Sequence, residues 1–128
     1  MGAQAALEVA ETYKKRGDDK FQKGDYCGAI EQYDKALTKS GELPAALAAT
    51  IHSNRAACFL KSGQNVDARA AARKALALDP CNKKALFRLA SAQTALGKHQ
   101  EAVVAFARLT KDATAGSPVP AAWNMART

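Results

Sequence analysis

Apolar and small residues recur along this chain at spacings of three and four residues, between short glycine-containing breaks. Such a period is typical of helices that bury one face. One stripe lies in each of three segments: Ala29, Ile30, Tyr33, Ala36 and Leu37; Ala68, Ala72, Ala75 and Leu76; and Ala102, Val103, Phe106 and Leu109. The pattern therefore predicts an all-α chain.

A glycine followed by a polar stretch and a small residue occurs three times, at residues 24–30, 63–69 and 97–103. The second and third copies are 34 residues apart, and the first precedes the second by 39. This period indicates stacked helical hairpins that present a continuous concave surface. Ala29, Ala68 and Ala102 stand where the helices of a hairpin should cross, and a larger side chain there would cost ~1–3 kcal/mol.

Setting the copies in register predicts repeats at residues 10–43, 49–82 and 83–116. The remaining residues are predicted to form an N-terminal helix extension (1–9), an inter-repeat extension (44–48) and a partial capping helix (117–128). We expect the first helix over 7–23, the second over 26–40, and a longer helix where Pro44 begins the second repeat. Trp123 and Met125 are the expected covering residues of the cap. The aromatic residues expected in the core are Tyr13, Phe21, Tyr26, Tyr33, Phe59, Phe87 and Phe106.

The 128 residues are 48% hydrophobic but only 6% aromatic, which suits closely packed helices. No apolar run approaches the roughly 20 residues that a membrane helix needs. The N-terminus lacks the basic start and apolar stretch of a secretory signal. We therefore expect no membrane insertion and a cytoplasmic or nuclear location. A module of this size is often part of a longer chain, and the short final helix fits that expectation.

The sequence contains no catalytic or metal-binding signature. Cys27, Cys58 and Cys81 form no CxxC pair, and His52 and His99 are 47 residues apart without a fixed acid or cysteine partner. The glycines form no phosphate-binding loop. We therefore predict a binding module, with no enzyme activity, metal or cofactor.

The net charge is +7, but the basic residues are spread along the chain, with one short cluster at residues 14–16. There is no Arg-rich tract and no aromatic RNA-binding signature. General nucleic-acid binding is therefore not favoured. Sequence-independent binding to RNA or an anionic membrane stays an alternative, and it predicts an affinity that falls steeply with salt.

The repeats resemble the tetratricopeptide repeat family over residues 10–110. The residues that carry the resemblance are Gly17, Phe21, Gly24, Tyr26, Ala29, Tyr33 and Ala36; Ala68, Ala75 and Pro80; and Ala90, Gly97, Ala102 and Phe106. The resemblance implies a right-handed superhelix of three hairpins with a short C-terminal cap. The segments 53–57 and 84–88 are most similar to the three-repeat domains of co-chaperones, and the longer first junction is similar to that of the myosin-chaperone members.

Those co-chaperone domains hold the acidic C-terminal tail of heat-shock protein 70 or heat-shock protein 90, which ends Glu-Glu-Val-Asp. Their carboxylate clamp uses two lysines, two asparagines and one arginine. Four of the five positions are matched here, by Lys14, Asn54, Lys84 and Arg88. The resemblance thus implies an adaptor that binds such a tail in its concave groove.

The residues support this assignment on physical grounds. Lys84 and Arg88 are four residues apart, so they project from one helix face, and Arg88 offers a rigid fork for a carboxylate. Lys14 and Asn54 fall on the inner helices of the two preceding repeats, where they can converge with that pair. On the following turn, the predicted groove lining comprises Ala57 and Leu60, for an apolar ligand side chain, and Lys61, as a further cation.

The fifth clamp position departs from the family, because Asp18 stands where the family has asparagine. An ionised carboxylate there would repel the ligand's carboxylate, and Asp18 lies four residues after Lys14, with which it can pair. Three outcomes stay open: weakened binding, a shifted ligand register, or a different ligand. The alternative function is a repeat scaffold that binds another protein or peptide without a free carboxylate.

Overall fold

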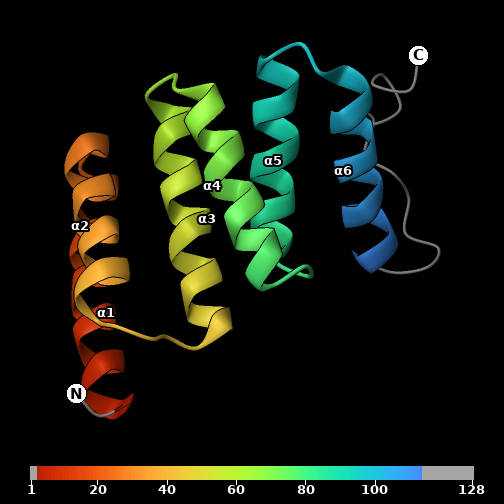
Figure 1. Ribbon diagram of the computed structural model, residues 1–128. Coiled ribbons are helices and arrows are strands. Elements are labelled where there is room, and N and C mark those ends of the chain that lie inside the picture. The colour runs from red at the N-terminus through yellow and green to blue at the C-terminus, as the bar shows by residue number, and fades with distance from the viewer. Residues whose placement is uncertain (1–2, 114–128) are drawn as a thin grey trace.

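The computed structural model describes residues 3–113, which form an all-α fold of three helical hairpins. The helices are α1 (Ala3–Gln22), α2 (Tyr26–Lys39), α3 (Ala45–Lys61), α4 (Asn65–Leu78), α5 (Lys83–Ala95) and α6 (His99–Ala113). They stand in a row from the first hairpin at one end to α6 at the other (Figure 1). Each helix packs against the next one in sequence, and α3 also contacts α5. The first helices of the second and third hairpins, α3 and α5, therefore lie on the same side of the array.

The predicted glycine turns are confirmed, and all three have the same hydrogen bonding. Gly24, Gly63 and Gly97 have φ values of 82°, 78° and 78°. The residue after each glycine donates its backbone N–H to a carbonyl five residues earlier, over 2.9, 2.8 and 2.7 Å. This is the Schellman ending of a helix, which requires a left-handed residue and so favours glycine.

The core is built largely from alanine, as the crossing positions predict. Ala29 and Ala68 are fully buried, and Ala102 is 3% exposed. Tyr33 is the largest fully buried side chain, and its ring packs against α1 at Gly17. A Cβ atom on Gly17 would lie 2.6 Å from Cε1 of Tyr33. The absence of a side chain at Gly17 therefore allows Tyr33 to approach α1 closely.

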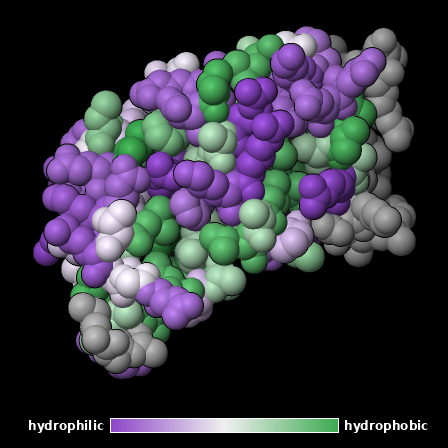
Figure 2. Space-filling model, viewed as in Figure 1, coloured by the Kyte–Doolittle hydropathy of each residue, from purple (hydrophilic) through white to green (hydrophobic). Residues whose placement is uncertain are grey.

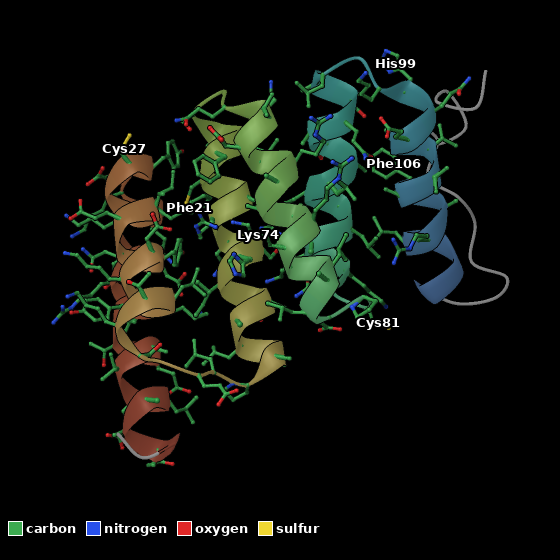
Figure 3. All side chains as sticks on the ribbon, in the orientation of Figure 1. Phe21, Cys27, Lys74, Cys81, His99 and Phe106 are labelled. Carbon is green, nitrogen blue, oxygen red and sulfur yellow. The ribbon has the colours of Figure 1, made fainter. Side chains whose placement is uncertain are left out.

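Three details differ from the sequence-based expectations. The first helix begins at Ala3 instead of residue 7, and α3 is longer than α5 but shorter than α1. Phe87 does not belong to the core, because its side chain is 54% exposed. Its ring and the ring of Phe106 form an edge-to-face pair with a centroid distance of 6.3 Å. Figure 3 shows Phe106 between α5 and α6. That expectation was wrong because α5 and α6 belong to the last described hairpin, where no further described helix packs over Phe87.

The predicted cap at residues 117–128, with Trp123 and Met125, lies outside the described residues. The repeat bounds stay predictions, since helix ends alone do not divide the chain at residues 43, 82 and 116. The link between α2 and α3 contains Gly41 at φ 77° and Pro44 directly before α3. This link carries the chain from the first hairpin to the start of α3 (Figure 1).

Candidate functional site

A pocket of about 300 Å³ lies among α1, α2, α3 and α5, and we call it the central pocket. Its lining residues are Lys14, Asp18, Phe21, Gln22, Tyr33, Thr50, Asn54, Ala57, Lys84 and Arg88. It therefore brings together all five residues of the predicted clamp, although Lys14 and Arg88 are far apart in sequence. Of the predicted groove lining, Ala57 belongs to the pocket, whereas Leu60 and Lys61 are not among its lining residues.

Lys14 and Asp18 form an ion pair inside this pocket. Nζ of Lys14 lies 3.0 Å from Oδ2 of Asp18, one helical turn along α1. The two side chains are 27% and 36% exposed, so neither charge is fully solvated. A ligand carboxylate at Lys14 therefore meets a cation that already has an anionic partner.

The other carboxylate oxygen of Asp18 accepts two more hydrogen bonds. The hydroxyl of Tyr33, on α2, donates to Oδ1, and Nδ2 of Asn54, on α3, donates to the same atom over 3.3 Å. Burial raises the pKa of Tyr33 well above its usual value, and the hydrogen bond and charge of Asp18 raise it further. Tyr33 therefore stays a protonated donor, and Asp18 connects three helices.

Tyr33 was missed as a member of the site. The sequence pattern placed it correctly in the buried stripe of α2, but that pattern carries no information about its hydroxyl. The only signal was indirect: a buried tyrosine usually needs a partner for its polar end. Asp18 is separated from Tyr33 by 15 residues, so the fold was needed to identify that partner.

The α5 side of the pocket contributes two cations. Asn82 caps α5 by accepting the backbone N–H of Ala85 over 2.9 Å, and this fixes the start of the helix that presents Lys84 and Arg88. Nη1 of Arg88 lies 3.5 Å from Oγ of Ser53 on α3. Burial lowers the pKa of Arg88, but an arginine keeps its charge at any ordinary pH. Lys84 is exposed and free to move toward a ligand.

Three cations and one carboxylate line the central pocket, so its formal charge is +2. The nearby thiol of Cys58 adds no charge at neutral pH, because burial raises its pKa to about 11. The pocket thus attracts an anion, and Arg88 supplies the planar donor group that suits a carboxylate. Its chemistry is that of a receptor for an anionic group.

Other site types find no support in residues 3–113. No group of His, Cys, Asp and Glu there could hold a metal ion. The labelled Cys27, Cys81 and His99 lie far from one another, on different helices or turns (Figure 3). No described helix is long and apolar enough to cross a membrane. On the face seen in Figure 2, hydrophilic residues cover much of the first hairpin and continue across the neighbouring helices, with hydrophobic residues between them.

Comparison with known proteins adds family evidence to this geometry. Two family models described as tetratricopeptide repeat match the chain, one over residues 14–82 and the other over residues 59–124. The chain is 40% identical over 96 residues to protein unc-45 homolog B of Xenopus laevis. That match covers 75% of this chain but 10% of the relative, so the chain spans about a tenth of that protein's length.

Several similar solved structures contain bound peptides, among them two second repeat domains of RPAP3. One is the second such repeat domain of human RPAP3 with the HSP70 peptide SGPTIEEVD, at 32% identity and a TM-score of 0.73, covering 81% of this chain and 82% of that one. The other is the second domain of Spaghetti (RPAP3) with the HSP90 peptide SRMEEVD, at 32% identity and a TM-score of 0.74. It covers 84% of this chain and 96% of that one.

Proposed function

This chain belongs to the tetratricopeptide repeat family, and from that premise we propose that it is a co-chaperone-type adaptor module. In this proposal it binds the acidic C-terminal tail of heat-shock protein 90 or heat-shock protein 70 in the central pocket. It acts by binding and carries out no catalysis. Such a partner would be met in the cytoplasm or nucleus.

The observation that carries the proposal is the convergence of Lys14, Asn54, Lys84 and Arg88 on one pocket of net charge +2. A free C-terminal carboxylate is a compact anion, and charge-assisted hydrogen bonds from lysine and arginine are the strongest that a protein offers it. The peptides bound by the two RPAP3 domains have the same acidic end. Ala57 offers a small apolar surface for a side chain further along the tail.

The test is calorimetric titration of the protein with SGPTIEEVD and SRMEEVD, each as a free acid and as a C-terminal amide. The free acids are expected to bind, and the amides to bind at least about tenfold more weakly, because each amide lacks the terminal charge. Equal affinity for acid and amide would contradict the proposal.

A matched pair of variants locates the interaction. Lys84→Ala removes an exposed cation that lines the pocket, whereas Lys83→Ala removes an exposed cation that does not. Loss of a charged hydrogen-bond donor weakens binding by ~1.5–3 kcal/mol when the contact is desolvated, and by less when it is exposed. Lys84→Ala should therefore weaken binding of the free-acid peptides about tenfold. Lys83→Ala should leave it within about twofold. If both variants behave alike, the peptide binds somewhere else.

A second candidate function is supported by Asp18. Its carboxylate already engages Lys14 and Asn54, which leaves two of the four matched clamp residues occupied. A scaffold that binds an internal segment of another protein needs no free carboxylate and tolerates this arrangement. The same acid–amide comparison separates the candidates, since such a scaffold has no preference for a free C-terminus.

A further inference from the structure

Resting on the proposed function, we propose that Asp18 is a specificity-determining residue of the central pocket. It selects peptide ends whose last side chain is an uncharged hydrogen-bond donor, such as an amide, over ends whose last side chain is acidic. Only the last residue of the tail is concerned, and the Glu-Glu-Val segment before it stays the same.

The charges in the pocket are unevenly placed. On α1, the formal charges of Lys14 and Asp18 cancel within an ion pair of 3.0 Å. On α5, Lys84 and Arg88 carry two positive charges, and no described carboxylate lines the pocket on that side. The terminal carboxylate of a peptide is therefore drawn to α5. The α1 side is left to receive the last side chain.

Asp18 has acceptor capacity left for that side chain. A carboxylate offers about four hydrogen-bond positions, and Lys14, Tyr33 and Asn54 use three of them. The side chain of Asp18 is still 36% exposed and lines the pocket. An amide N–H from the ligand can fill the remaining position. A second carboxylate cannot, because it would bring a like charge against Asp18.

Neither Lys14 nor Asn54 offers an acidic side chain an easy alternative. Both already donate to Asp18, over 3.0 and 3.3 Å. The ammonium of Lys14 has three N–H donors, so an incoming carboxylate could accept from it while the pair with Asp18 persists, but two like charges would then share one cation at close range. The site therefore favours one ligand carboxylate over two.

The experiment compares the isosteric peptides SRMEEVD and SRMEEVN by fluorescence anisotropy, at one ionic strength and neutral pH. The native protein is expected to bind SRMEEVN at least about tenfold more tightly than SRMEEVD. In Asp18→Asn, SRMEEVD should bind about as tightly as SRMEEVN or more tightly. Asp19→Asn is the matched control: it makes the same charge change on the neighbouring residue, which does not line the central pocket, and the preference should persist.

Each result bears on the inference. It is overturned if the native protein binds SRMEEVD as tightly as SRMEEVN, or if Asp18→Asn leaves the preference unchanged. The comparison on the native protein decides the matter alone should Asp18→Asn fail to fold. C-terminal amides of both peptides distinguish a failure of the proposed function from a failure of the preference assigned to Asp18. If the amides bind as well as the acids, the proposed function fails too. If only the preference for SRMEEVN is missing, the proposed function stands without this inference.

Discussion

Asn54 donates a hydrogen bond from Nδ2 to Oδ1 of Asp18 over 3.3 Å, which joins the second hairpin to the first inside the central pocket. In the clamp that the sequence resembles, both positions would be asparagines directed at a ligand. Here one of the two is an acid, and the other donates to it. The pocket thus contains a carboxylate of its own before any ligand arrives.

Removing that carboxylate should destabilise the fold. Asp18→Ala leaves the hydroxyl of the buried Tyr33 without its acceptor, and an unsatisfied buried polar group costs ~1–3 kcal/mol. Asp18→Asn keeps an acceptor oxygen and should cost about 1 kcal/mol or less. Urea denaturation measures both, with the exposed Asp19→Ala as control. Equal losses for Asp18→Ala and Asp19→Ala would contradict the role assigned to the Tyr33 bond.

The close approach at Gly17 should also be sensitive to substitution. Gly17→Ala places a Cβ atom 2.6 Å from the ring of Tyr33, and that buried ring has little room to move. We expect a net loss of about 1–3 kcal/mol despite the higher helix propensity of alanine. Thermal unfolding monitored by circular dichroism measures it. A gain in stability would show that the ring of Tyr33 can move to make room, and that its hydrogen bond to Asp18 is not held in one geometry.

Stability should fall on mild acidification because of His52. Burial, together with the positive charges of the neighbouring Arg55 and Lys74, lowers its pKa from 6.5 to about 4. Because the folded pKa lies below the unfolded one, the unfolded chain binds the extra proton between these values. The contribution of neutral His52 to the free energy of unfolding is therefore fully present above about pH 6.5. It is lost as the pH falls toward 4.

The measurement is the free energy of unfolding at pH 7 and pH 4.5 for the native protein and His52→Gln. The native protein should lose roughly 1–3 kcal/mol more than the variant over this range, since glutamine does not titrate. Substitution of the exposed His99 by glutamine serves as the control and should leave the pH dependence unchanged. Parallel curves for the native protein and His52→Gln would disprove the assignment.

The geometry of Arg88 predicts that lysine cannot replace it. Arg88→Lys keeps the positive charge but loses the planar fork, so free-acid tail peptides should bind about tenfold more weakly. Lys84→Arg keeps both charge and reach on the same helix and should bind within about threefold of the native protein. Fluorescence anisotropy titrations measure the affinity of both variants for the free-acid peptides. Full retention of affinity in Arg88→Lys would mean that charge alone holds the ligand.

Much of this molecule could be predicted from its sequence because its determinants are local. The turn glycines and the small residues at helix crossings act within one hairpin, and both were recognisable at fixed spacing. The convergence of Lys14, Asn54 and Arg88 followed from placing each on the inner helix of its repeat. Helix faces are periodic, so sequence alone carries that information.

What sequence could not supply depends on distances between helices. The bond from Tyr33 to Asp18 requires the depth at which α2 packs on α1, which Gly17 sets through a contact absent from any local pattern. Phe87 was misassigned for a related reason: its spacing is that of a core residue, but burial needs a neighbouring helix on the same side. Leu60 and Lys61 are not among the residues that line the central pocket, and their place in the groove stays a prediction.

The contacts of Asp18 reach α1, α2 and α3 at once. One side chain thus influences both how the first two hairpins are oriented and which ligand the molecule prefers. Residue 18 is therefore pleiotropic in the genetic sense. A mutation there that changes ligand preference also changes the packing between the first two repeats. Divergence in ligand preference at this position should therefore proceed together with compensating changes at Tyr33 or Asn54.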